Sequence, residues 1–244
     1  MENLFGGLHA VHYLPILTTI FSAFFLTSIF GRYLKKGGNH LLWWSIGVFT
    51  YGVGTFFESF ITLFGNSPML NKSWYVAGAI LGGYPLAQGS VYLHLKDRKA
   101  HILSAITVPF IIFASVAVFL SPVNLALLES FRPSGASLEW QWVRLLTPFI
   151  NGYSAFFLIG SAALSAYKFF KIPEMKNRAL GNILITIGAI LPGVGGGMAK
   201  AGMVEALYIG EFVGIILIYF GYRACLADGP ADSVKQDFAS APVP

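Results

Sequence analysis

Residues 13–31 read YLPILTTIFSAFFLTSIFG, and this stretch determines the fold class that we expect. It contains no charged side chain, and its polar groups are only small hydroxyls and the Tyr13 phenol. A bilayer core about 30 Å thick is crossed by about 20 apolar residues in an α-helix. We therefore predict that residues 13–31 form a transmembrane helix.

Six more runs of this kind follow, at 41–64, 74–95, 101–120, 142–167, 179–199 and 206–222. The whole chain is 55% hydrophobic and only 11% charged, with a mean hydropathy of +0.66. Soluble domains contain about 25% charged residues, so a water-soluble fold is excluded. The sequence predicts an all-α polytopic membrane protein, with seven transmembrane helices in residues 1–225 and a disordered cytoplasmic tail at 226–244.

The distribution of basic residues predicts the orientation of these helices. Short loops rich in Lys and Arg stay in the cytoplasm. If the N-terminus lies outside and the C-terminus inside, the cytoplasmic segments contain most of the sixteen Lys and Arg residues, namely Arg32, Lys35, Lys36, Lys96, Arg98, Lys99, Lys168, Lys171, Lys176, Arg178, Arg223 and Lys235. The positive net charge thus reflects topology and indicates the lipid bilayer, not nucleic acid, as partner. With no organelle signal evident, we expect a bacterial inner membrane.

Short matches between the two halves of the chain indicate an internal duplication. Residues 22–26 and 154–158 both read SAFFL, and each copy follows a proline. Two GxxxG pairs, Gly78 with Gly82 and Gly210 with Gly214, are separated by the same offset as the SAFFL copies. Between them, GVFTYGVG at 47–54 matches GAILPGVG at 188–195. The order of the matches is the same in both halves.

The duplication predicts two three-helix repeats, 13–95 and 142–222, joined by a linker helix at 101–120. An odd number of spans per repeat, followed by one linker, gives both repeats the same orientation. This plan resembles that of the SWEET-type carriers and the PQ-loop proteins. Their Pro-Gln dipeptide is absent, since the nearest approach is Pro85-Leu-Ala-Gln88, and no site residue is carried over from them.

Two carboxyl groups fall inside the expected spans, where ionisable groups are costly and usually functional. Glu58 and Glu211 each lie about six residues from an outer helix end, or roughly 9 Å below the surface. Their shared depth predicts one outward-opening polar cavity between the second, fifth, sixth and seventh helices. Other ligand- or proton-binding candidates are Asn151, Tyr51, Thr55 and Tyr208 at a similar level, and Gln88 with Tyr84 deeper, while Arg144 and Lys200 are candidate counter-ions. The alternative is a structural pair, satisfied by neighbouring hydroxyls.

The sixth apolar run contains a candidate gating joint. Proline removes a backbone hydrogen bond and glycine weakens the helical turn that follows. Unwound backbone in a membrane is tolerated where it lines a cavity or is buried in protein. We expect distortion at Pro192, Gly193, Gly195, Gly196 and Gly197, with close glycine packing of an unbroken helix as the alternative.

These features favour a small-solute or proton-coupled membrane carrier or binding protein. Two alternatives stay open: a seven-helix sensory or receptor-like module without an output domain, and a non-catalytic subunit of a larger membrane complex. Contacts with a second copy or a partner subunit are expected through Gly78, Gly82, Gly210 and Gly214. No enzyme, cofactor or metal motif is found in the sequence.

Overall fold

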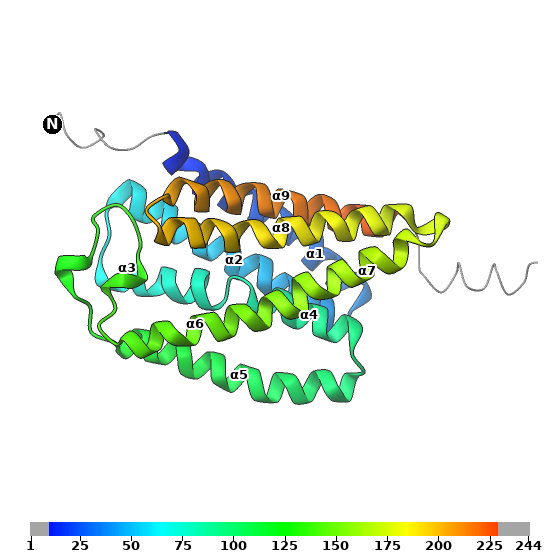
Figure 1. Ribbon diagram of the computed structural model, residues 1–244, viewed down its shortest axis with the longest axis horizontal. Coiled ribbons are helices and arrows are strands. Elements are labelled where there is room, and N and C mark those ends of the chain that lie inside the picture. Colours follow the sequence, from blue (N-terminus) through cyan, green and yellow to red (C-terminus); the bar gives the residue numbers. More distant parts are fainter. Residues whose placement is uncertain (1–9, 229–244) are drawn as a thin grey trace, which may run out of the picture.

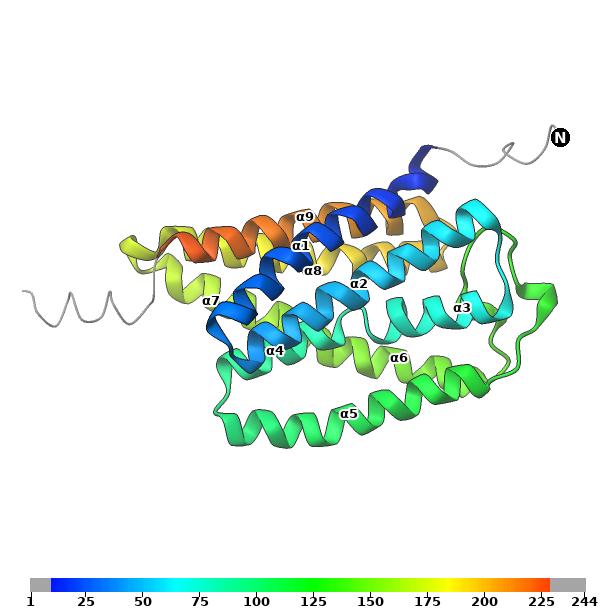
Figure 2. The same ribbon diagram turned by 180° about the vertical axis from the view of Figure 1, so that it is seen from behind.

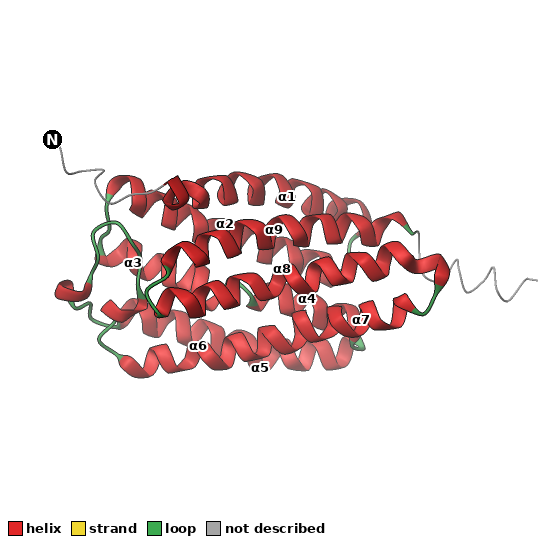
Figure 3. Cartoon of the chain, turned by 45° about the horizontal axis from the view of Figure 1, so that its top comes forward, coloured by secondary structure: helices red, strands yellow, loops and turns green. Residues whose placement is uncertain are grey.

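The chain folds into a bundle of roughly parallel and antiparallel helices, described here by a computed structural model (Figures 1 and 3). The structure describes residues 10–228, apart from the side chain of Lys200. The long helices are α1 (Leu14–Lys36), α2 (Asn39–Phe64), α5 (Asp97–Leu120), α8 (Lys176–Lys200) and α9 (Val204–Ala227). Two interrupted segments complete the bundle: α3 (Pro68–Trp74), η2 (Tyr75–Ile80) and α4 (Tyr84–His94), then α6 (Gln141–Ser154), η5 (Ala155–Gly160) and α7 (Ser161–Phe170).

Six helical stretches of the described residues are long and apolar enough to cross a membrane: Ala10–Lys36, Asn39–Phe64, Asp97–Leu120, Gln141–Phe170, Pro173–Ala199 and Val204–Ala227. Large apolar side chains cover the outside of the bundle, among them Phe24, Phe49, Phe113, Phe149 and Phe156. An apolar surface of this extent is unfavourable in water and is expected in hydrocarbon. The prediction of an all-helical protein of membrane character is confirmed.

The third expected run is not one helix, because it is broken at residues 81–83 between η2 and α4. Pro85 has no N–H to donate to the carbonyl of Leu81, four residues earlier. The Thr50 hydroxyl of α2 donates to that carbonyl instead, at 3.2 Å. A side chain at Gly82 would collide with the carbonyl oxygen of Gly78, so this turn requires glycine at that position. Figure 2 shows α3 and α4 following one another along the bundle with this turn between them.

The sixth expected run, by contrast, is continuous, so the predicted break at 192–197 is wrong. α8 passes through Pro192 as an α-helix. Pro192 has no N–H to donate to the carbonyl of Gly188, four residues earlier. A Cβ on Gly214 of α9 would lie 2.7 Å from that carbonyl oxygen and 3.1 Å from the ring of Pro192. Because Gly214 has no side chain, α9 approaches closely enough to cover both groups. Close packing through glycine, the alternative, describes this helix.

The contact between α8 and α9 is a glycine seam, which we define as Gly181, Gly188 and Gly195 of α8 with Gly210, Gly214 and Gly221 of α9. A Cβ at any of these positions would lie 2.5–2.7 Å from a backbone carbonyl oxygen of the other helix. Small residues allow such backbone approach in membranes. Gly210 and Gly214, expected to contact a second subunit, therefore already have a packing partner within the chain.

The remaining core consists of two apolar clusters. One joins α1, α2 and α9 through Phe25, Val48, Ile215 and Tyr219. The other joins η2, α4, α5 and α6 through residues such as Tyr84, Ile111, Val118 and Ile150. Because the first cluster holds α9 against α1 and α2, it positions the acidic side chains described in the next subsection.

The connection between α5 and α6 is an irregular loop, as expected for 121–141. It contains the short turns η3 (Leu125–Leu127) and η4 (Gly135–Ser137). Asn71 of α3 is fully buried beneath it, where its side chain donates to Ser137 Oγ and to the carbonyl of Ser134 and accepts from the N–H of Ser134. We call this end of the bundle the loop end.

At the opposite end of the bundle α1, α4, α7 and α9 finish (Figure 1). Eleven of the twelve bases assigned to the cytoplasm lie there, and Lys235 lies outside the described residues. We call it the basic end. α9 extends to Ala227, so its helix continues past the expected start of the tail at 226, while 229–244 lie outside the described residues.

The glycine seam predicts that replacing a glycine of α8 by alanine changes the stability of the protein by an amount that depends on whether that glycine faces α9. In Gly188→Ala the new methyl group meets the carbonyl of Gly214 at 2.6 Å, so we expect the free energy of unfolding to fall by about 1–3 kcal/mol. In Gly197→Ala the methyl group meets nothing within 4 Å, and higher helix propensity should leave stability equal or up to about 1 kcal/mol higher. Thermal unfolding in one detergent compares them, and equal effects would contradict the seam.

Candidate functional site

Glu58 of α2 and Glu211 of α9 meet inside the bundle towards its loop end. Their carboxyl groups lie within hydrogen-bonding range of each other. Glu58 is 1% exposed and Glu211 is half-buried. α2 ends at the loop end and α9 begins there. Glu58 lies six residues before the end of α2 and Glu211 seven residues after the start of α9, so the two side chains are at the same height in the bundle. The structure thus brings together the two acids that the sequence placed at one depth.

Two aromatic donors position this carboxyl pair. The indole Nε1–H of Trp74, at the end of α3, donates to Glu58 Oε1 at 2.7 Å. The Tyr51 hydroxyl, two turns before Glu58 on α2, donates to the backbone carbonyl of Glu211 at 2.9 Å. Hydrogen bonds to buried acids are among the stronger ones in proteins. They connect α2 to both α3 and α9 at the level of the pair.

Three polar atoms of this region have no donor or acceptor among the described residues: Glu58 Oε2, Glu211 Oε2 and the hydroxyl of Tyr208. Tyr208 is itself 1% exposed. Unsatisfied buried groups are rare and call for an explanation. Two ionised carboxylates in contact would repel each other, whereas a single proton on either acid turns the contact into an O–H···O hydrogen bond. The geometry therefore fits a pair that shares a proton.

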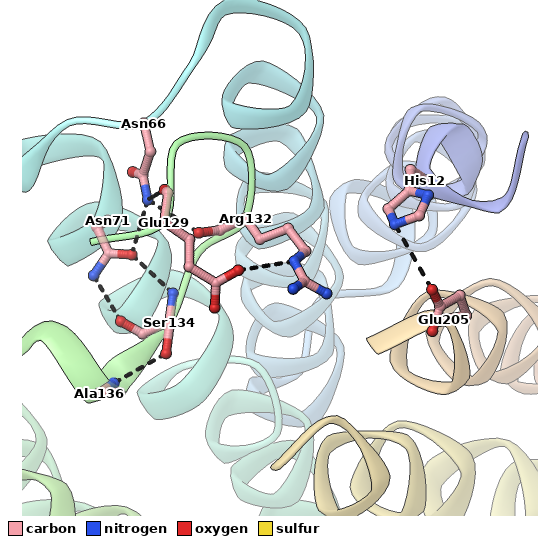
Figure 4. Close-up of polar contacts among 8 residues, drawn as sticks. All are labelled: His12, Asn66, Asn71, Glu129, Arg132, Ser134, Ala136 and Glu205. Atoms are coloured by element: carbon pink, nitrogen blue, oxygen red, sulfur yellow. Dashed lines mark hydrogen bonds and ion pairs between the residues drawn. The ribbon is translucent and has the colours of Figure 1, made fainter. Parts of the chain in front are cut away.

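A line of polar groups connects the carboxyl pair with the surface at the loop end. Glu205, Tyr208 and Glu211 follow one another at three-residue spacing, so Tyr208 neighbours both acids on the surface of α9. Across from them, His12 of η1 (Ala10–Tyr13) is buried, with its ring edge-on to Tyr208 at a centroid distance of 6.1 Å. His12 Nε2 lies 3.8 Å from Glu205 Oε1, as Figure 4 shows, and the Glu205 side chain is 44% exposed.

Thr55 belongs to the same region, whereas Asn151 does not. The Thr55 hydroxyl lies 3.0 Å from that of Thr19, which joins α2 to α1 one turn from Glu58. Asn151 is exposed on the outside of α6. The pair lies between α2, α3 and α9, so the second and seventh of the four helices expected at the site do meet there, whereas the expectation that Asn151 of the fifth helix faces the pair is wrong. The depth of Asn151 can be predicted by counting residues along the helix, but the direction of its side chain cannot.

The predicted counter-ions are not in contact with the pair. Arg144 donates to Gln141 on its own helix, at 2.9 Å. The side chain of Lys200 lies outside what the structure describes. Among the bases of the described residues, none forms an ion pair with Glu58 or Glu211. Among the groups that the structure describes, a shared proton is then the available means of neutralising one of the two acids.

Gln88 and Tyr84 form a separate network with no unsatisfied atom. Gln88 donates to Ser104 Oγ at 2.7 Å and accepts from the Tyr153 hydroxyl at 2.6 Å. The Tyr84 hydroxyl lies 2.7 Å from Thr107 Oγ1. These bonds hold α4 against α5 and α6. The network is structural in its geometry, because every polar group of Gln88 and Tyr84 named here already has a protein partner.

Trp74, His12 and Glu205 complete the site and were not among the predicted residues. Trp74 lies near the end of an apolar run, where tryptophans commonly anchor a helix at the membrane surface. The sequence does not indicate that its N–H instead donates to Glu58. His12 stands beside the first apolar run, where its burial is not visible from the pattern. No group of three or more His, Cys, Asp or Glu residues suited to a metal occurs in the described part of the chain.

Comparison with known proteins finds no match to a family model, a curated protein or a solved structure.

Removal of the Trp74 donor provides a test of the geometry. Trp74→Phe leaves Glu58 Oε1 buried without its N–H partner, and we expect the free energy of unfolding to fall by about 1–3 kcal/mol. The matched control is Trp142→Phe, whose ring is 44% exposed and stacks on Trp140. Thermal unfolding in detergent should show a clearly larger loss for Trp74→Phe. Equal losses would mean that the indole of Trp74 does not hold Glu58.

Proposed function

We propose that the protein is a proton-coupled carrier of a small solute in a bacterial inner membrane. The observation that carries the proposal is the contact between the Glu58 and Glu211 carboxyl groups in the interior of a helical bundle of membrane character. Ionisable groups at such depth are costly and mark proton or solute pathways. In this proposal the pair gains and loses one proton in each transport cycle.

The proposed membrane arrangement has seven crossings, with the interrupted segment from α3 to α4 as the third. The concentration of bases at the basic end supports a cytoplasmic location for that end and an outside location for the N-terminus. The 3+1+3 duplication remains part of the proposal. Its support comes from the sequence matches, since the third crossing is broken whereas its proposed counterpart α9 is continuous.

The broken third crossing supports a moving part next to the pair. Interrupted helices recur at the binding sites of transporters, where the irregular backbone lines a cavity or is buried. Here the turn at 81–83 separates α4 from η2 and α3, and α3 carries Trp74, the donor to Glu58. A movement of α3 about this turn would change the hydrogen bonding of Glu58 directly. In this proposal the gating joint is the turn at 81–83, and not residues 192–197.

The polar line on α9 supports proton exchange through the loop end. Glu205 is partly exposed at the loop end, His12 and Tyr208 are buried next to it, and Glu211 is three residues after Tyr208 on α9. Proton transfer between such groups needs short steps, and residues three apart on a helix lie about 5–6 Å from each other at Cβ. Loss of a proton from the pair would therefore occur towards the outside.

The protonation of the pair can be tested with a hydrophobic carbodiimide, which reacts with protonated carboxyl groups in apolar surroundings. At neutral pH we expect mass spectrometry to find the adduct on Glu58 or Glu211. The control is Glu139, which is exposed in the loop and should remain unmodified. Labelling should fall at high pH as the pair loses its proton. Absence of any adduct on both acids in the intact, folded protein would contradict a shared proton.

Transport is tested in proteoliposomes that contain a pH-sensitive dye and have an imposed pH gradient. Amino acids, sugars, organic acids and ammonium compounds are added in turn as substrate classes. We expect one class to accelerate proton movement at least tenfold over empty liposomes, and Glu58→Gln and Glu211→Gln to abolish the acceleration. Glu139→Gln serves as the control and should retain it. Solute flux that is unchanged in both site variants would overturn proton coupling through the pair.

A further inference from the structure

A groove at the basic end lies between the last turns of α1 and α9, on the opposite end of the molecule from the carboxyl pair. Its volume is about 630 Å³, and it is open to the outside of the bundle. One wall is a stripe of α1 from Thr27 to Lys36, and the other is a stripe of α9 from Tyr222 to Ala227. Gly31 stands in the α1 wall, and a Cβ there would meet nothing within 4 Å, so this glycine keeps the groove wide.

The charge of this groove is strongly positive. Its lining contains the four bases Arg32, Lys35, Lys36 and Arg223, and no acidic residue. Arg223 is directed by a hydrogen bond from its Nη1 to the Tyr219 hydroxyl, at 3.1 Å. The closest acid along α9, Asp228, accepts hydrogen bonds from the side chain of Asn177 and the backbone N–H of Arg178 and so is engaged away from the groove. Four bases that form no ion pair with any acid in residues 10–228 indicate an anionic ligand with several acceptor oxygens.

The polarity of the groove changes along the bundle in the order of a phospholipid. The hydroxyl residues Thr27 and Ser28 follow the bases towards the middle of the bundle. One turn further, Phe24 of α1 is 52% exposed and Phe220 of α9 is 54% exposed. The bases match the phosphate of a phospholipid, and the hydroxyl residues match its glycerol esters. The exposed aromatic rings match its acyl chains. A free phosphate would use only the first of these three layers.

We propose that this groove is a binding site for an anionic phospholipid. The phosphate accepts from Arg32, Lys35 and Arg223, and the acyl chains lie along Phe24 and Phe220. Basic pockets between transmembrane helices on the cytoplasmic side bind such headgroups. The site is independent of the carboxyl pair, because it shares no residue with it and lies at the other end of the bundle.

The test uses the full chain, purified in detergent and exposed to vesicles or micelles containing phosphatidylglycerol, cardiolipin or phosphatidylcholine. Native mass spectrometry counts the lipids that each variant retains, and a titration gives the apparent affinity. The wild-type chain should retain phosphatidylglycerol or cardiolipin and release phosphatidylcholine. Arg32→Gln, Lys35→Gln and Arg223→Gln together should weaken the apparent affinity at least roughly 100-fold, because each charge-assisted hydrogen bond made directly to the phosphate contributes a factor of about ten.

A matched control separates a site from general charge attraction. Lys96→Gln, Arg98→Gln and Lys99→Gln together remove the same charge from exposed positions at the same end, and should leave the affinity within about threefold of wild type. Gly31→Phe fills the groove without removing any charge, and should abolish retention at unchanged thermal stability. Thermal unfolding of every variant identifies any loss that is due to misfolding.

Three results would overturn the proposal. The first is an equal loss of affinity in the groove variants and the control variants, which would show non-specific attraction. The second is undiminished retention in a folded Gly31→Phe variant. The third is full displacement of phosphatidylglycerol by millimolar inorganic phosphate, which would show a free-anion site. Failure of proton coupling at Glu58 and Glu211 would leave all of these outcomes unaffected.

Discussion

Two carboxyl groups cannot be buried among apolar helices unless each finds a partner, and the arrangement of this bundle follows from that requirement. Glu58 is on α2 and Glu211 is on α9, the last helix of the bundle. The two carboxyl groups can meet only if α9 packs next to α2. The glycine seam brings α9 against α8, and the contacts of Phe25 with Tyr219 and Tyr222 bring it against α1. Both sets of contacts fix the height at which Glu211 faces Glu58.

Two prolines inside apolar runs have opposite effects, and their surroundings explain the difference. Pro85 follows two glycines, and the carbonyl that it leaves without an N–H is bonded by the hydroxyl of Thr50. The helix there can break without leaving an unsatisfied polar group in the membrane interior. Pro192 faces a glycine of α9, whose backbone covers the freed carbonyl of Gly188, so α8 remains regular. The decisive factor is the neighbouring helix, not the proline.

This contrast shows which features a single sequence can predict. Six long apolar helices follow from apolar length, and the pairing of Glu58 with Glu211 follows from counting residues to the helix ends, since both use only position along an axis. Rotation about that axis is set by packing. Asn151 therefore has a comparable depth but is exposed, and Trp74 turns its N–H inward although its position is that of an anchor in the headgroup region. For the same reason the GxxxG spacing of Gly210 and Gly214 predicts a close helix contact but does not show that the contacting helix is α8 of the same chain.

The burial of Asn71 has a consequence for biosynthesis. Its amide is satisfied by Ser134 and Ser137, at separations of 63 and 66 residues, and these are still unmade when α2 and α3 leave the ribosome. Until residues 134–137 have been translated, the Asn71 amide group lacks both of these acceptors and needs water or another polar group as a partner, because an unbonded buried amide is costly. The packing of α3 beneath this loop can therefore be completed only after residues 134–137 have been translated, whereas the bond from Trp74 to Glu58 spans only 16 residues and needs no later part of the chain.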